Sequence, residues 1–178
     1  TVFRQQNTSR IALNAHAMKN GETKLLYGDD FQFIDVSDVA EAVQSIQEIY
    51  QKAVKTYGLE QVQVLSPFRL KSDAGVKNLN QMLRELANPL INKTMELSYG
   101  NTSFRFGDKV MQTKNTDVAS NGDIGFIVKV DKNNDDVLIV KFSDHRCKTY
   151  TIDELNQLEL AYATTIHKSQ GSEYECVI

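Results

Sequence analysis

Polar side chains that suit phosphate chemistry follow the last long apolar stretch of the chain. Residues 158–166 are predicted to form a strand, and directly after it come His167-Lys168-Ser169-Gln170-Gly171-Ser172-Glu173. Ligands of open α/β sheets bind at the carboxyl ends of the strands. Hydroxyls, a lysine, a histidine and backbone N–H groups suit phosphate oxygens, and Gly171 permits a tight turn. The alternative is a solvated loop between a strand and a helix, and the residue types alone leave both readings open.

This polar run also resembles a known helicase motif. Thr165-x-His167-Lys168-x-Gln170-Gly171-x-Glu173 is similar to motif V of superfamily 1 helicases, especially in the RecD-like branch, the family of exodeoxyribonuclease V alpha subunits. In that family the Thr and His lie against the DNA backbone, and the Gly-x-Glu end reaches the nucleotide. The roles that the resemblance implies are single-stranded DNA binding for Thr165, His167 and Lys168, ATP binding for Gly171 and Glu173, and coupling of the two sites for Gln170.

A second candidate site is Phe3-Arg4-Gln5 near the beginning of the chain. As a tripeptide it is equally consistent with a solvated surface arginine. It resembles helicase motif IV, where an aromatic residue and an arginine face the nucleotide. The resemblance implies that Arg4 is catalytic and binds the γ-phosphate, since a planar guanidinium neutralises charge on the transferred phosphoryl group. Phe3 and Gln5 are then ATP-binding residues, and Arg4 and Glu173 should face one nucleotide.

A third candidate is the segment Val64-Leu65-Ser66-Pro67-Phe68, followed by Gly75. It resembles the strand, loop and helix that RecD-like helicases place beside the DNA. Ser66 ends a predicted strand, so the resemblance implies that its hydroxyl meets a phosphate; Arg69 or Lys71 could do the same. A charged loop with no ligand is the alternative.

The elements that must position these residues are predicted from the spacing of apolar side chains. Phe31, Phe33 and Ile34 indicate a short strand. Asp38 with Glu41 is a helix N-cap signal, an apolar face follows at three- and four-residue spacing, and Gly58 ends the helix. Residues 62–65 predict a buried strand, and residues 79–86 predict a helix that Asn88-Pro89 closes. This order favours an α/β layer with parallel strand pairing.

Between about residues 103 and 152 the apolar residues alternate in steps of two. Residues 124–130 and 138–142 are two such sets, and turn-forming clusters at 121–123 and 131–136 bound them. Short strands at this spacing predict a small antiparallel barrel. Thr151 and Glu154 form the pattern of a capping box. Phe106-Gly107-Asp108-Lys109-Val110-Met111-Gln112, paired with 121–125, resembles the SH3-like barrel inserted in RecD-like helicases, which lies near the DNA strand.

The predicted fold class is therefore α/β: a partial RecA-like parallel sheet domain, of the P-loop NTPase type, with an inserted antiparallel SH3-like barrel. The expected boundaries are 1–100 and 156–178 for the second RecA-like motor domain, and 101–155 for the barrel. The chain begins at Thr1 and ends inside an apolar run, so we expect it to be incomplete at both ends. No phosphate-binding G-x-x-x-x-G-K-[ST] loop occurs in it.

Composition restricts the function classes. The 178 residues are 41% hydrophobic and 24% charged with a net charge of −3, so any DNA contacts must be local rather than a broad basic surface. Two cysteines, Cys147 and Cys176, exclude a disulfide framework and a zinc ribbon. No stretch approaches the roughly 18 apolar residues of a membrane span, and no signal peptide is apparent, so a cytoplasmic location is expected.

The resemblance implies part of an ATP-dependent DNA helicase that supplies one face of the ATP site and part of the single-stranded DNA track. ATP and Mg²⁺ are the implied cofactors, with the Mg²⁺ ligands outside this chain. The implied partners are single-stranded DNA, the first RecA-like domain and other subunits of a recombination nuclease. The chain by itself is expected to be inactive. The alternative is a non-catalytic single-stranded DNA-binding or adaptor module of a nuclease complex.

Overall fold

A computed structural model describes residues 9–92 and 95–178, with the backbone alone at Asp136. The chain divides into two units, residues 1–37 and 38–178. In the first unit, helix α1 (Arg10–Lys19) begins at Ser9, whose hydroxyl accepts a hydrogen bond from the amide of Ile11. The side chain of the buried Asn14 bonds both the N–H and the C=O of Leu26, which holds the returning chain against α1.

The strand predicted over Phe31–Ile34 is wrong. The segment makes one isolated antiparallel bridge, between Gly28 and Phe31, and Phe33 and Ile34 are exposed. The ring of Tyr27 contacts those of Phe31 and Phe33, with centroids 6.0 and 6.1 Å apart. A strand needs a neighbouring strand that bonds its backbone N–H and C=O groups. Here the pairing stops after the single bridge from Gly28 to Phe31.

The α/β part of the second unit contains two helices and a small parallel sheet. Helix α2 (Val39–Tyr57) has Asp38 as its N-cap, bonded to the amide of Glu41, and Gly58 as its C-cap, both as predicted. A 3₁₀ turn (Leu59–Gln61) leads into strand β1 (Val62–Ser66), which is also as predicted. Helix α3 (Val76–Ala87) follows and ends at Asn88.

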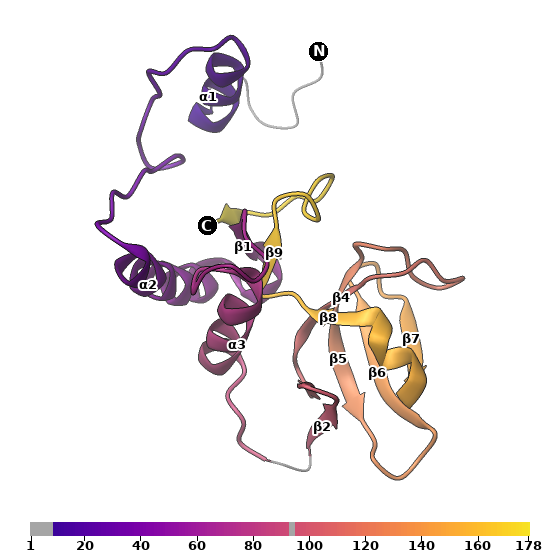
Figure 1. Cartoon of the computed structure of the whole chain (residues 1–178). Coiled ribbons are helices and arrows are strands. Elements are labelled where there is room, and N and C mark those ends of the chain that lie inside the picture. The colour runs from indigo at the N-terminus through magenta and orange to yellow at the C-terminus, as the bar shows by residue number, and fades with distance from the viewer. Residues whose placement is uncertain (1–8, 93–94) are drawn as a thin grey trace. The chain divides into compact units, whose positions relative to one another are not determined.

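Strand β1 is the central strand of a three-stranded parallel sheet. It pairs with β9 (Ala163–Thr165) on one side and with β10 (Cys176–Val177) on the other, which confirms the parallel pairing expected from the sequence. Helices α2 and α3 lie beside these strands (Figure 1). The core of this layer includes Tyr50, Val62, Val64, Leu79, Leu83 and Tyr162.

The barrel part is a five-stranded antiparallel sheet in the order β7-β6-β5-β4-β8. Its strands are β4 (Lys109–Gln112), β5 (Ile124–Val130), β6 (Asp136–Phe142), β7 (Cys147–Thr151) and β8 (Leu158–Leu160). A hairpin of β2 (Glu96–Tyr99) and β3 (Thr102–Arg105) precedes it. The capping box of Thr151 and Glu154 is present and starts a 3₁₀ helix (Ile152–Gln157).

The strand predicted over residues 158–166 is two strands in two sheets. Strand β8 pairs antiparallel with β4 of the barrel, and β9 pairs parallel with β1. Ala161 and Tyr162 connect them, and both are fully buried. One apolar run therefore leaves the barrel and enters the parallel sheet without a polar linker.

Candidate functional site

Two loops that carry predicted site residues leave the same edge of the parallel sheet. Ser66 and Thr165 are register partners at the carboxyl ends of β1 and β9. The loop after β1, residues 67–75, and the turn after β9, residues 166–173, therefore begin side by side. This is the edge at which open α/β sheets bind ligands.

The turn after β9 is held by its own backbone. The amide of Ser169 bonds the carbonyl of Thr165, and the amide of Ser172 bonds the carbonyl of Ser169. The Thr165 hydroxyl accepts a hydrogen bond from the amide of Lys168. Gly171 has a φ of 89°, a left-handed conformation that favours glycine. These bonds present the polar side chains of the turn toward solvent.

Most of the predicted residues in this turn are accessible to a ligand. His167, Gln170, Gly171 and Glu173 are exposed, while Thr165 and Lys168 are half-buried. Phe3, Arg4 and Gln5 lie outside the described residues, so the expected convergence of Arg4 with Glu173 stays a prediction. The exposed carboxylate of Glu173 has the accessibility that an acceptor for ribose hydroxyls needs.

Ser66 has a structural task in addition to its place at the strand end. Its side chain is 3% exposed, and its hydroxyl donates to the carbonyl of Ala74 at 2.7 Å and accepts from the amide of Phe68 at 3.2 Å. The carbonyls of Phe68 and Arg69 in turn accept from the first amides of α3. Ser66 therefore shapes the loop that carries Arg69, and its hydroxyl is already engaged within the protein.

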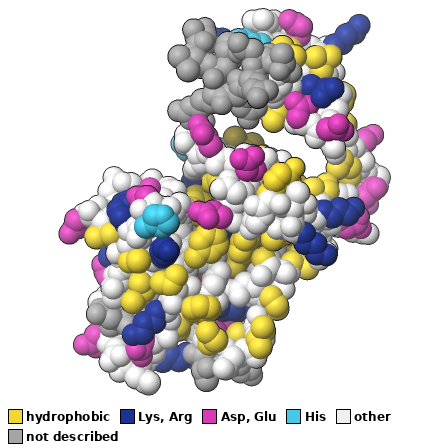
Figure 2. Space-filling view, turned by 180° about the vertical axis from the view of Figure 1, so that it is seen from behind, with side chains coloured by type: hydrophobic (Ala, Val, Ile, Leu, Met, Phe, Trp, Pro, Cys, Tyr) yellow, Lys and Arg dark blue, Asp and Glu magenta, His cyan; other side chains and the backbone are white. Residues whose placement is uncertain are grey.

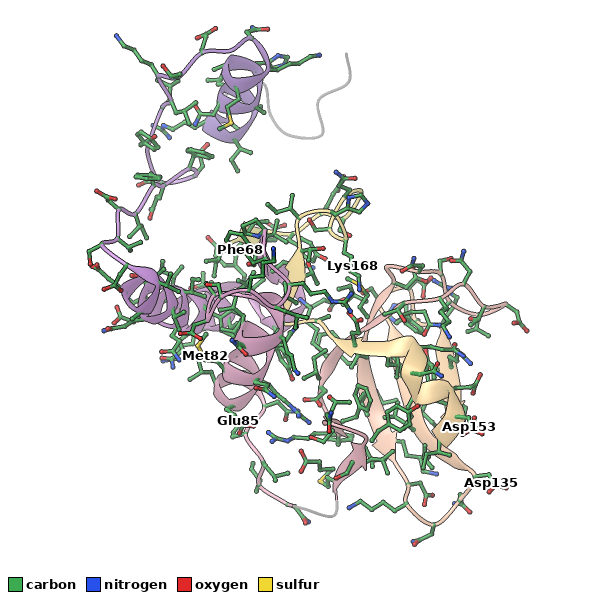
Figure 3. The ribbon with its side chains drawn as sticks, in the orientation of Figure 1. Phe68, Met82, Glu85, Asp135, Asp153 and Lys168 are labelled. Atoms are coloured by element: carbon green, nitrogen blue, oxygen red, sulfur yellow. The ribbon has the colours of Figure 1, made fainter. Side chains whose placement is uncertain are left out.

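A cleft of about 280 Å³ lies between these loops and the barrel. Arg69 comes from the loop after β1, Thr165, His167 and Lys168 come from the end of β9 and its turn, and Glu159 comes from β8 of the barrel. Lys168 projects between the turn after β9 and the barrel strands (Figure 3). The remaining lining residues are Val76, Met111, Leu160, Ala163 and Thr164.

The carboxylate of Glu159 binds two cations at the mouth of this cleft. It accepts from Arg69 at 2.7 Å through Oε1 and from Lys168 at 2.8 Å through Oε2. No local pattern in the sequence marks Glu159, because it lies in an ordinary strand of the barrel. Its approach to Arg69 spans 90 residues of chain.

A side-chain amide on helix α3 bonds strand β9 at the edge that does not pair with β1. The side chain of Asn80, 6% exposed, donates to the carbonyl of Ala163 and accepts from its amide, both at 2.9 Å. Asn80 thus satisfies backbone groups that a further strand would otherwise bond. No pattern in the sequence marks Asn80, since its partner is 83 residues away.

Asp108 joins the barrel to the α/β part. Its buried carboxylate accepts from two nitrogens of Arg84 on α3, from Asn88 at the end of α3, from the amide of Arg105, and from the hydroxyl of Tyr162 just before β9. Burial, followed by the charge of Asp108, raises the pKa of Tyr162. This buried carboxylate holds together the chain segments that lead to both sides of the cleft.

Lys109, the next residue, makes a second buried connection. Its ammonium group donates to the carbonyls of Leu59 and Val62 at 3.2 and 2.9 Å, and it lies 5.4 Å from the ring centre of Tyr174. Burial lowers the pKa of Lys109 from 10.5 to about 8. The ammonium is therefore a structural donor between β4 and the beginning of β1.

Figure 2 shows Lys and Arg side chains scattered among acidic ones on the face it presents. Within the described residues, no three His, Cys, Asp or Glu side chains are grouped so that they could hold a metal ion. No helix in those same ranges is long and apolar enough to cross a membrane.

Comparison with known proteins finds similarity to DNA helicases. Residues 79–142 match the family described as the SH3 domain of ATP-dependent RecD-like DNA helicases. The chain is 32% identical over 179 aligned residues to an ATP-dependent RecD2 DNA helicase of Deinococcus radiodurans. That alignment covers 99% of this chain and 23% of the relative, so the chain spans about a quarter of the relative's length.

A solved structure of Pif1 helicases, described as two helicases coordinating to unwind forked double-stranded DNA, resembles the chain in fold. It has a TM-score of 0.52 and 17% identity, and the alignment covers 99% of this chain and 41% of that one. At this identity the likeness concerns the fold alone. The sequence matches, rather than this likeness in fold, relate the chain to RecD-like DNA helicases, to one of which it is similar over 99% of its length.

Proposed function

We propose that the full protein is an ATP-dependent DNA helicase that moves along single-stranded DNA in the cytoplasm, and that this chain supplies one face of its ATP site and part of its DNA track. The observation that carries the proposal is the register pair of Ser66 and Thr165, which brings the loop with Arg69 and the turn with His167 to one sheet edge. The similarity of the sequence to RecD-like DNA helicases supports the same reading.

In this proposal the strand passes over the cleft beside the barrel. Thr165, His167 and Lys168 contact its backbone, and Arg69 reaches it from the neighbouring loop. The contribution of Ser66 is to fix that loop, because its hydroxyl bonds Ala74. Phosphate contacts of this kind hold the strand without reading its sequence.

The nucleotide lies at the other end of the same turn. Gly171 and Glu173 contact ATP, and Phe3, Arg4 and Gln5 approach it from the segment before α1, with Arg4 on the γ-phosphate. Gln170 lies between the DNA-contacting and ATP-contacting residues of the turn, which suits a coupling role. The Mg²⁺ that accompanies ATP is held by residues outside this chain.

The domain assignment follows from these roles. The predicted bounds are 1–100 and 156–178 for the second RecA-like domain and 101–155 for the inserted SH3-like barrel, and the pairing of β8 (Leu158–Leu160) with β4 extends the barrel to residue 160. The partners are single-stranded DNA, the first RecA-like domain and the other subunits of a recombination nuclease. Nucleotide binding closes the two RecA-like lobes and hydrolysis reopens them, so the contacts here alternately grip and release the strand.

Steady-state ATP hydrolysis by the full protein, with and without a single-stranded oligonucleotide, tests the proposal. Hydrolysis should depend on DNA, Arg4→Ala should abolish it while sparing DNA binding, and the 178-residue chain alone should hydrolyse no ATP. Loss of DNA binding in Arg4→Ala would instead move Arg4 to the DNA track. A full protein that binds single strands and never hydrolyses ATP would be an adaptor module, and the motor assignment would be wrong.

A further inference from the structure

Two cations that line the cleft are both bound by one carboxylate of the barrel. Arg69 and Lys168 belong to different loops, 99 positions apart in the printed sequence, yet each bonds a separate oxygen of Glu159, at 2.7 and 2.8 Å. Glu159 itself belongs to β8, outside both loops. The barrel thus places an anion where the proposed strand needs its own anions to bind.

The chemistry of this arrangement matches that of a bound phosphodiester. A carboxylate and a phosphodiester each carry one negative charge shared by two oxygens, and the arginine fork binds either. A phosphate that displaces the carboxylate would therefore find the same two cations.

Exposure shows that the carboxylate can be displaced. The side chains of Arg69, Glu159 and Lys168 are 64%, 40% and 32% exposed. Ion pairs this accessible stabilise a protein by only about 0–1 kcal/mol each, so exchanging one anion for another loses little. The buried pair of Arg84 and Asp108, by contrast, could not open without leaving a buried charge.

We propose that Glu159 competes with a backbone phosphate of single-stranded DNA for Arg69 and Lys168, and so limits how tightly the cleft holds the strand. This inference rests on the proposed DNA track. It assigns to Glu159 the role of weakening the binding of single-stranded DNA. A translocating protein must release its strand in each cycle, and a built-in competitor lowers the barrier to release.

Binding of a fluorescein-labelled oligo(dT) to the full protein, followed by anisotropy, tests the inference. Glu159→Gln keeps the size of the side chain and removes its charge, so it should bind about three- to tenfold more tightly at low salt. The dependence of log K on log salt should steepen by about 0.7 for each cation made available to the strand. Should glutamine disturb β8, Glu159→Ser carries the same expectation.

The matched control is Glu85→Gln. The carboxylate of Glu85 is 55% exposed and pairs with the largely buried Arg105 at 2.6 Å, and its loss changes the net charge equally. It lies on α3, away from Lys168 (Figure 3). The affinity of Glu85→Gln for oligo(dT) should stay within about twofold of that of the unsubstituted protein, since the charge of Glu85 is outside the cleft. An equal gain in both variants would show a general charge effect and overturn the inference.

A second arm separates this inference from the proposed function. Arg69→Ala with Lys168→Ala should weaken binding, and adding Glu159→Gln to that pair should then change nothing. If the double variant weakens binding but Glu159→Gln alone leaves it equal or weaker, Glu159 orients the cations and only the inference falls. If neither changes binding, the strand lies elsewhere and the proposed track falls too. A gain in ATP affinity without a gain in DNA affinity in Glu159→Gln would also overturn the inference about Glu159.

Discussion

The hydroxyl of Tyr162 donates a hydrogen bond of 2.9 Å to the carboxylate of Asp108, across 54 residues of chain. Tyr162 belongs to the core of the parallel sheet, and Asp108 directly precedes the first barrel strand. The bond therefore joins the two parts of the molecule beside the cleft.

Asp108→Asn should destabilise the chain strongly. The asparagine cannot accept from all the donors of Arg84, Asn88, Arg105 and Tyr162. It also removes the nearer of the two carboxylates that pair with the buried Arg84, which keeps only Glu96 at 3.5 Å. Removing one partner of a buried pair decreases the free energy of unfolding by about 3–5 kcal/mol. Urea unfolding measures the change. Asp117→Asn, at an exposed aspartate of the barrel, should change stability by less than about 0.5 kcal/mol. Equal midpoints for the two variants would contradict the joining role.

Lys109→Met should change how stability depends on pH. Because burial lowers the pKa of Lys109 from 10.5 to about 8, the unfolded chain binds a proton between these pH values that the folded chain does not. Stability contributed by this group is thus fully present above pH 10.5 and is lost as pH falls to 8.

The unfolding free energy of the unsubstituted protein minus that of Lys109→Met should therefore rise by roughly 2–3 kcal/mol over that interval. The buried tyrosines titrate alike in both proteins, so the difference isolates the lysine. Chemical unfolding at a series of pH values measures it. A flat difference would show that Lys109 stays charged throughout, held by the carbonyls of Leu59 and Val62.

Asn80→Ala should loosen the strand that carries the proposed DNA-binding turn. It leaves the N–H and C=O of Ala163 without their side-chain partner, at a cost of roughly 2 kcal/mol. Hydrogen exchange at residues 163–165 should accelerate, and affinity for oligo(dT) should fall. Asn78→Ala on the same helix, where the side chain bonds Ser72 from an exposed position, is the control. Unchanged exchange at Ala163 in Asn80→Ala would count against this positioning.

Gly171→Ala should impair DNA-stimulated ATP hydrolysis by the full protein. Nothing lies within 4 Å of the added methyl group, so the cost is that of the left-handed backbone, about 1 kcal/mol. The turn relieves this strain by moving Gln170 and Glu173, and a displacement of even about 1 Å at a site can reduce a rate 100-fold. Gly122→Ala in a barrel turn, with a φ of 100° and equally open space, has the same strain and should leave hydrolysis unchanged. Equal rates in both variants would remove Gly171 from the ATP site.

The elements that short-range patterns specify could be predicted from the sequence. Asp38 with Glu41 begins α2, and Thr151 with Glu154 forms a capping box. The polar residues between Thr165 and Glu173 lie together in the turn after β9. In each case the interacting groups are within a few residues of one another, so the pattern and the contact coincide. The alternation of apolar side chains likewise predicted β5 and β6, because strand faces repeat every second residue.

Only the tertiary structure decided where distant segments meet. The run 158–166 reads as one strand, but its two halves join different sheets, since strand partners are chosen by packing rather than by the strand itself. Glu159, Asn80 and Asp108 look ordinary in the sequence, because the groups they bind lie as many as 90 residues away. Local propensity specifies which residues share a helix or a turn; the contact of one element with another depends on how the whole chain buries its core.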